Sequence, residues 1–102
     1  KKMTLEQLET CIVHWAHIRG IAEPGNGRNQ LLKTLEELGE LSRATLKNDK
    51  AGIKDGIGDV LVTLIIFAHT QGLDINTCLD AAWQEIKDRT GVTLNGTFIK
   101  NG

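Results

Sequence analysis

The sequence predicts an all-α fold in which four helices form a bundle, a short β-hairpin follows at the C-terminus, and several chains assemble as an oligomer. Apolar residues recur at spacings of three and four over four segments, which is the period of an amphipathic helix. An Asn-Gly pair between two short apolar runs predicts the hairpin. The third helical segment is apolar around its whole circumference, and a chain of 102 residues is small for covering such a helix alone.

Composition excludes several functional classes. With 40% hydrophobic and 25% charged residues, residues 1–102 are expected to form a single globular domain. The net charge of −1 offers no basic field to a nucleic acid backbone, so we expect no nucleic acid partner. No apolar stretch reaches the roughly 20 residues of a membrane span, and no signal-peptide pattern is present. We therefore expect a cytoplasmic protein with no membrane partner, and two isolated cysteines fit that reducing compartment.

The first two helices are expected on either side of a glycine-rich loop. The first spans residues 5–19, and Thr4 and Gln7 have the spacing of a capping box at its start. Three glycines and the single proline mark residues 20–27 as the loop. The second helix is expected over residues 29–47, where leucines form one stripe.

The second half of the chain is expected to hold two more helices and the hairpin. Asp49 can cap the third helix, which should end before Gly72. The fourth helix is expected over residues 74–91. Residues 92–99 then predict a hairpin with a type I′ turn at Asn95-Gly96. An isolated hairpin is marginally stable in water, so we expect it to pack on a helix or on a neighbouring chain.

The third helix carries the prediction of an oligomer. It is apolar on every face between residues 60 and 67, and a helix of this kind must be buried on all sides. We therefore expect a homodimer or homotetramer whose interface includes Val62, Ile65 or Ile66.

Two short stretches concentrate acidic side chains. Glu37 and Glu40 stand three residues apart on the second helix, and Asp55 and Asp59 stand four apart on the third. Like charges at these spacings disfavour a helix by roughly 0.2–0.5 kcal/mol per pair, and a divalent cation would offset that cost. The alternative is a solvated charged face, and in the second helix neighbouring basic residues are also available as partners.

The spacing on the third helix favours a metal site over a solvated face. Asp55 and Asp59 share one stripe with Val62 and Ile66, and a solvent-facing stripe would not continue as apolar residues. Ligands that are all oxygen indicate a hard cation, with Mg²⁺ expected and Mn²⁺ as a substitute. Two antiparallel helices would then hold one or two ions that neutralise phosphate oxygens and activate a water. The predicted metal ligands are Glu37, Glu40, Asp55 and Asp59.

The acidic stretches resemble the MazG-like all-α nucleoside triphosphate pyrophosphohydrolases, whose hallmark is ExxE on one helix and ExxD on the next. The segment Glu37-Leu-Gly-Glu40 is similar to the first motif, and Asp59 matches the Asp of the second. The resemblance extends from Trp15 to Arg89 and looks closest to the short phage- and integron-type members. In one departure, the Glu of the second motif should fall at residue 56, which is a glycine here. Asp55 is the candidate replacement, and without it the site has lost a ligand.

The resemblance implies Mg²⁺-dependent hydrolysis of nucleoside or deoxynucleoside triphosphates to monophosphate and pyrophosphate, as in house-cleaning of the nucleotide pool. The implied catalytic residues are Glu36 and Glu37. Glu36 is a candidate water-orienting base, and an exposed helix residue is the equal alternative. The implied substrate contacts are Lys33, Lys87, Arg89, Gln84 and Trp15. For the basic residues the alternative is surface pairing, and for Trp15 it is core packing.

A rival hypothesis from another functional class is a catalytically impaired module that dimerises through its helices or binds nucleotide without turnover. The feature of this sequence that raises this alternative is Gly56, which stands where the motif has a Glu. A turnover assay with Mg²⁺ and a nucleoside triphosphate separates the two hypotheses.

Overall fold

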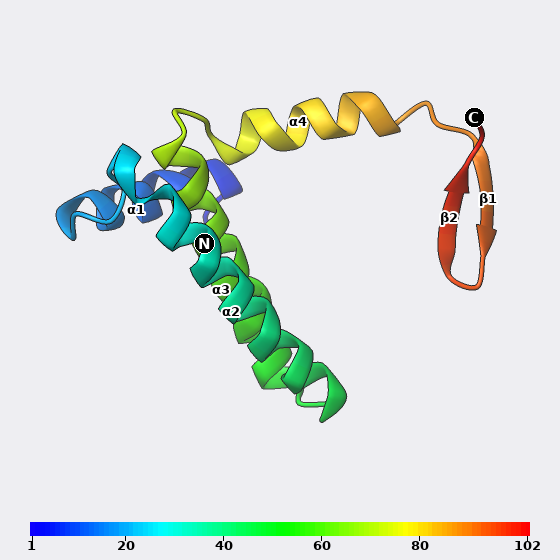
Figure 1. Cartoon of the computed structure of the whole chain (residues 1–102), viewed down its shortest axis with the longest axis horizontal. Helices are drawn as coiled ribbons and strands as arrows, with labels where there is room; N and C mark the ends of the chain where they lie inside the picture. Colours follow the sequence, from blue (N-terminus) through cyan, green and yellow to red (C-terminus); the bar gives the residue numbers. More distant parts are fainter.

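The structure, a computed structural model that describes all of residues 1–102, contains four α-helices and a C-terminal two-stranded hairpin (Figure 1). The bounds are α1 Leu5–Ile18, η1 (a 3₁₀ turn) Pro24–Asn26, α2 Gly27–Leu46, α3 Lys50–Thr70, α4 Ile75–Ile86, β1 Gly91–Leu94 and β2 Thr97–Lys100. The strands are antiparallel, and Asn95 and Gly96 in the turn between them both have positive φ, as a type I′ turn requires. The predicted all-α fold class with four helices and a C-terminal hairpin is confirmed, and the oligomer remains a prediction.

Local capping residues fix where the helices begin. The Thr4 hydroxyl accepts a hydrogen bond from the backbone N–H of Gln7, and the Gln7 side chain accepts one from the backbone N–H of Thr4, so the predicted capping box is present. The predicted cap of α3 is also confirmed, because Asp49 accepts a hydrogen bond from the N–H of Gly52. Asp74 caps α4 in the same way. The start of each of these helices is thus determined by residues within one helical turn of it.

Two helix boundaries differ from the prediction. α2 begins at residue 27 rather than 29, because Pro24 starts the 3₁₀ turn that leads directly into the helix. α4 ends at Ile86 rather than at residue 91. The N–H of Arg89 bonds the carbonyl of Ile86, which closes the helix in a tight turn before the hairpin.

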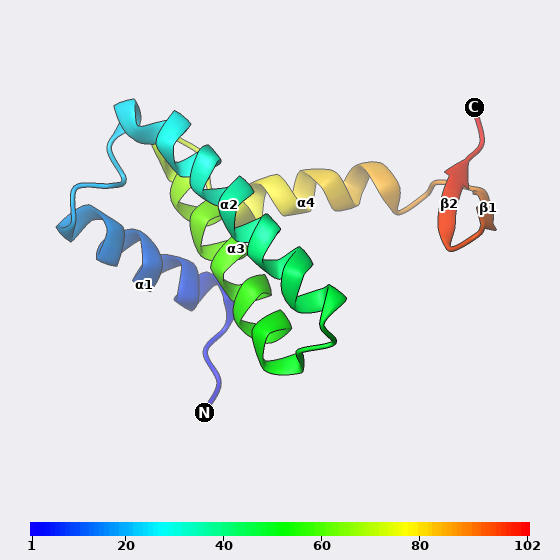
Figure 2. The same ribbon diagram turned by 60° about the horizontal axis from the view of Figure 1, so that its bottom comes forward.

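α2 and α3 form the antiparallel pair at the centre of the fold (Figures 1 and 2). Gly56 on α3 lies directly against Leu41 on α2, so the two backbones approach closely there. Further along the pair, the hydroxyl oxygens of Thr34 and Thr63 lie 2.9 Å apart, and both residues are buried. The Thr63 hydroxyl also donates to the carbonyl of Val60, so this buried polar contact is satisfied.

The hydrophobic core of the single chain is small and lies where α1 and the following loop cover α3. Ile66 is its largest fully buried side chain. The buried hydrophobic residues are Ala16, Ala22, Ile65, Ile66 and Ala68. Ile65 and Ile66 are thus buried within their own chain and are not available to a subunit interface, whereas Val62, the third residue predicted there, is half-buried. The exposed apolar side chains of α3 are instead Ile57 and Leu61.

α4 and the hairpin extend away from the other three helices (Figures 1 and 2). The carboxylate of Glu9 on α1 accepts a hydrogen bond of 2.7 Å from the N–H of Ile75, which anchors the first residue of α4 to α1. Beyond this anchor no residue of α4 is buried, and the hairpin contacts no other element. The hairpin therefore does not pack on a helix of its own chain, which leaves a neighbouring chain as its predicted partner.

Large apolar side chains are left uncovered on this extended part. Leu79, Trp83 and Ile86 recur on one face of α4, and Phe98 and Ile99 lie on β2; each is about half exposed. None of the four α-helices combines the length and the hydropathy that a membrane span requires. In the single chain, this apolar surface has no partner.

Candidate active site

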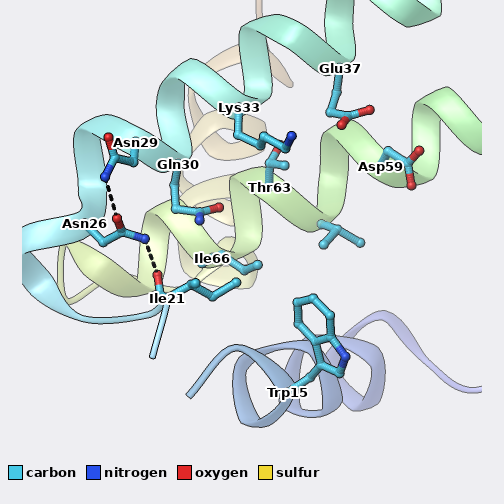
Figure 3. A pocket seen from close by; sticks show the side chains of 11 residues that line it. Trp15, Ile21, Asn26, Asn29, Gln30, Lys33, Glu37, Asp59, Thr63 and Ile66 are labelled. Atoms are coloured by element: carbon cyan, nitrogen blue, oxygen red, sulfur yellow. Dashed lines mark hydrogen bonds between the residues drawn. The ribbon is translucent and has the colours of Figure 1, made fainter. Parts of the chain in front are cut away.

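A cavity of about 570 Å³ opens between α1, α2 and α3 (Figure 3). Its polar lining comes mainly from one side of α2, where residues spaced three and four apart face the same way. Glu37 and Asp59 lie at one end of the cavity, and Asn26 and Asn29 lie at the other (Figure 3). The lining residues are Trp15, Ile21, Asn26, Asn29, Gln30, Lys33, Glu37, Asp59, Val62, Thr63 and Ile66.

The stripe predicted on α3 is largely present. Asp59, Val62 and Ile66 all line the cavity, so an acidic residue does lie at the rim of an apolar recess. Asp55, one turn before Asp59, is exposed and does not line the cavity. It forms no ion pair either, although Lys54 is adjacent in sequence.

Glu37 is at the electrostatic centre of the acidic residues. Desolvation raises the pKa of its carboxyl group, the nearby carboxylates of Glu40 and Asp59 raise it further, and Lys33 lowers it. Asp55 is not among the charges that shift this pKa. We refer to Glu37, Glu40 and Asp59 as the acidic cluster. Their mutual repulsion is unfavourable in the free protein, and bound positive charge would relieve it.

The acidic cluster fits a hard divalent cation by its chemistry, because every donor atom is a carboxylate oxygen. No three acidic, histidine or cysteine side chains converge closely enough to coordinate a single ion. Glu37 and Glu40 are one turn apart on α2, and Asp59 faces Glu37 from α3, so side-chain rotation would be needed to bring them onto one ion. Of the four predicted ligands, the structure groups three and leaves Asp55 apart.

The residues predicted beside the acidic cluster differ in position. Lys33 lines the cavity, and its ammonium group lies 3.3 Å from a carboxylate oxygen of Glu36. Both side chains are largely exposed, so this ion pair adds little stability and Lys33 is free to exchange partners. Glu36 itself is not part of the cavity lining, whereas Glu37 is. Of the two predicted catalytic residues, only Glu37 faces the cavity.

The predicted substrate contacts on the C-terminal side are far from this cavity within the same chain. Gln84 lies on the projecting helix α4, and Lys87 and Arg89 follow it; all three are exposed (Figure 1). The guanidinium of Arg89 lies 3.4 Å from the carboxylate of Glu85 on the preceding turn. A single chain does not bring these residues to the cavity.

Trp15 is brought to the cavity from α1 and is nearly half exposed, so it is not a core residue. The guanidinium of Arg19 lies 4.1 Å from the centre of the Trp15 ring and covers one of its faces. The indole therefore forms a polarised aromatic wall opposite α2 (Figure 3).

The sequence interpretation missed the amide side chains of the cavity: Asn26, Asn29 and Gln30. A signal for one of them was present, because Gln30 precedes Lys33 by three residues and Glu37 by seven, which is one face of a helix. On α2 the prediction followed charged residues alone and did not extend that face toward the start of the helix.

Comparison with known proteins places both acidic stretches inside a recognised domain. Residues 27–91 match the family model of the MazG nucleotide pyrophosphohydrolase domain, which is more than half of the chain. The "Uncharacterized 18.2 kDa protein in rep-hol intergenic region" of Haemophilus phage HP1 (strain HP1c1) is 39% identical over 70 residues, covering 69% of this chain and 43% of the relative. The match thus spans less than half of that relative. No solved structure matches the chain. The chain belongs to the MazG nucleotide pyrophosphohydrolase family.

Proposed function

We propose that this chain hydrolyses nucleoside or deoxynucleoside triphosphates to the monophosphate and pyrophosphate in a Mg²⁺-dependent reaction. The observation that carries the proposal is that one cavity joins two members of the acidic cluster, Glu37 and Asp59, to a lysine, an aromatic ring and several amides. The acidic end suits phosphates that are bridged by a cation, and the aromatic and amide end suits a nucleoside. Membership of the MazG family supports the same reaction class.

The residues have distinct roles in this proposal. Glu37, Glu40 and Asp59 would hold Mg²⁺, or Mn²⁺ as a substitute, and the ion supplies neutralisation of phosphate oxygens. Lys33 exchanges its exposed pairing with Glu36 for a phosphate oxygen. We assign the orientation of the attacking water to a carboxylate oxygen of Glu37, because Glu36 lies outside the cavity lining. Removal of nucleotides unsuited to DNA synthesis is the proposed biological use.

We further propose that the chain acts as a homodimer or homotetramer. Its exposed area is 7815 Å², whereas a compact monomer of 11.2 kDa exposes about 5,700 Å². Its radius of gyration is 16.0 Å, compared with about 13 Å for a compact chain of this length. The surplus area of about 2,100 Å² is what one protomer of an obligate oligomer buries.

Assembly also gives a role to the residues that lie far from their own cavity. The uncovered face of α4 and the hairpin are the surfaces on which a second copy would bury exposed apolar side chains. If α4 docks on a partner, Gln84, Lys87 and Arg89 reach the partner's cavity as sugar and phosphate contacts. We expect neither nucleic acid nor membrane among the partners, because the net charge is −1 and the apolar surface is divided between α4 and the hairpin.

Pyrophosphate release tests the function directly. The purified chain is incubated with Mg²⁺ and each member of a panel of nucleoside and deoxynucleoside triphosphates, and pyrophosphate and monophosphate are quantified. We expect turnover that excess EDTA stops and that Mn²⁺ partly restores. The Lys2→Ala variant, exposed and outside the cavity lining, serves as the control for Lys33→Ala, which should lower turnover. Absence of turnover across the whole panel would reject the proposal.

The second candidate is a nucleotide-binding or dimerisation module without turnover. The observation that favours it is the buried glycine at residue 56, where the motif calls for a carboxylate. This candidate predicts saturable binding of monophosphate and triphosphate with no pyrophosphate release at any Mg²⁺ concentration.

A further inference from the structure

We propose that the side-chain amide of Gln30 binds the edge of the substrate's nucleobase, and that it does so without selecting between amino and keto bases. The inference rests on the proposed function, since it concerns the same cavity. The base would lie at the end of the cavity remote from the acidic cluster.

Gln30 is the buried polar residue of the cavity lining whose side chain bonds no protein group. The residue is only 8% exposed, and its amide makes no hydrogen bond to any group of the chain. The polar atoms of the amide keep access to solvent through the cavity, because no side-chain nitrogen or oxygen of the chain is both buried and unbonded. The amide points from α2 into the cavity (Figure 3). A ligand inside the cavity can therefore supply the missing partners.

The neighbouring amides are already engaged, which distinguishes Gln30 from them. The Asn26 side chain donates a hydrogen bond of 2.8 Å to the carbonyl of Ile21, and the Asn29 side chain donates one of 2.9 Å to the Asn26 side-chain oxygen (Figure 3). A backbone carbonyl only accepts, so this chain of bonds fixes how both asparagine amides are turned. Nothing in the protein fixes the Gln30 amide in that way.

The surroundings of Gln30 suit a flat aromatic ligand. Trp15 lines the same cavity from α1, and the apolar side chains of Ile21 and Ile66 line it as well (Figure 3). A nucleobase combines a ring that packs on such walls with an edge that carries adjacent hydrogen-bond donors and acceptors. Neither a phosphate nor a metal ion would use an apolar wall beside a neutral amide.

The freedom of the Gln30 amide decides its selectivity. In one orientation the amide pairs with an amino group and the adjacent ring nitrogen, as in cytosine or adenine. After a 180° flip it pairs with a carbonyl and the adjacent ring N–H, as in uracil or guanine. Because no protein group favours either orientation, Gln30 contributes affinity for a base but little discrimination.

Binding of reaction products tests this inference without requiring turnover. Dissociation constants of dCMP, dUMP and inorganic pyrophosphate are measured by calorimetry for the wild type, Gln30→Leu and Gln30→Glu. We expect Gln30→Leu, which keeps the size of the side chain, to weaken dCMP and dUMP by about tenfold each and to leave pyrophosphate unchanged. A carboxylate only accepts, so Gln30→Glu can take a bond from the amino group of cytosine or from the ring N–H of uracil but can donate to neither, and it should weaken dCMP and dUMP by similar factors.

Two further readouts exclude a merely structural role. Gln30→Leu removes an amide that bonds no protein group, so its thermal midpoint should stay close to that of the wild type. A lowered midpoint with equal weakening of all three ligands would overturn the inference, as would unchanged nucleotide binding. If the wild type hydrolyses nucleotides but their binding does not depend on Gln30, the role of Gln30 is wrong and the proposed hydrolysis stands. If nucleotide binding depends on Gln30 but no turnover is found, the proposed hydrolysis is wrong and the role of Gln30 stands. If no nucleotide binds, both are wrong.

Discussion

Gly56 on α3 faces Leu41 on α2 so closely that a Cβ atom at residue 56 would lie 2.9 Å from Leu41 Cδ1 and 3.2 Å from Leu41 Cα. Gly56 occupies the position at which the second motif of the MazG-like family has its Glu. A larger residue there would have to push the paired helices apart, whereas Gly58 has no atom within 4 Å of the corresponding position. The helix pair is therefore adapted to the glycine, and any compensating carboxylate must come from another residue.

Asp55 is the residue predicted to compensate, and its contribution should be smaller than that of Asp59. We expect Asp55→Asn to raise the Mg²⁺ concentration needed for half-maximal turnover by a few fold, because Asp55 lies one turn from Asp59 but outside the acidic cluster. Steady-state kinetics against Mg²⁺ measure this. An unchanged Mg²⁺ dependence would show that Asp55 is a surface residue and that the site works with three carboxylates.

The acidic cluster itself should be essential. Asp59→Asn and Glu40→Gln keep side-chain size but remove charge, and each should reduce turnover by more than about 100-fold, since even residues that only support metal ligands cost 10–100-fold. Pyrophosphate release and far-ultraviolet circular dichroism are measured together. Glu6→Gln, exposed on α1 and outside the cavity lining, is the control. Near-normal activity in either cluster variant would contradict the assignment.

Glu37 makes the stability of the metal-free protein depend on pH. The raised pKa of the Glu37 carboxyl group means that the native state disfavours its charged form. The contribution of Glu37 to the free energy of unfolding is therefore fully present below its unfolded-state pKa, and it is lost as pH rises through its folded-state pKa. In EDTA at pH 7, Glu37→Gln should therefore melt about 1–4 °C higher than the wild type, and the difference should vanish near pH 3.5. Melting curves with added Mg²⁺ should reverse the order at pH 7. A lower melting temperature for the variant in EDTA would argue against repulsion at this site.

The bond between Glu9 and the N–H of Ile75 should hold α4 in its direction. Glu9→Ala leaves a partly buried N–H without its charged partner and should destabilise the chain by about 1.5–3 kcal/mol. Amide hydrogen exchange should accelerate first at the start of α4. Glu6→Ala, an exposed residue on the same helix, should change stability far less.

The uncovered face of α4 should control assembly. Trp83→Glu places a charge on the apolar face and should convert the oligomer to monomers at micromolar concentration, because an unpaired charge is costly to bury. Asp80→Asn, one residue off that face, should leave assembly intact. Light scattering distinguishes the species, and a wild-type chain that is already monomeric would refute the proposed assembly.

The parts of the fold that could be predicted are those encoded within a few turns. Thr4 and Asp49 cap the helices that follow them, and the Asp59–Val62–Ile66 stripe needed only the helical period. The direction of α4 could not be predicted, because it depends on a bond between residues 66 positions apart in sequence. The position of Gln30 on the Lys33–Glu37 face of α2 could be predicted from the helical period, but its burial could not, because burial of a polar residue depends on how the chain folds around it.

The five small and medium-sized side chains that make up the buried apolar core have a calorimetric consequence. A compact domain of about 100 residues gains roughly 1.2–1.5 kcal/mol/K of heat capacity on unfolding, mostly from newly exposed apolar surface. An isolated chain that already exposes that surface can gain only part of this amount. With the proposed assembly, the remainder appears as a negative heat-capacity change of association. The temperature at which the protein is most stable should then shift as the solution is diluted.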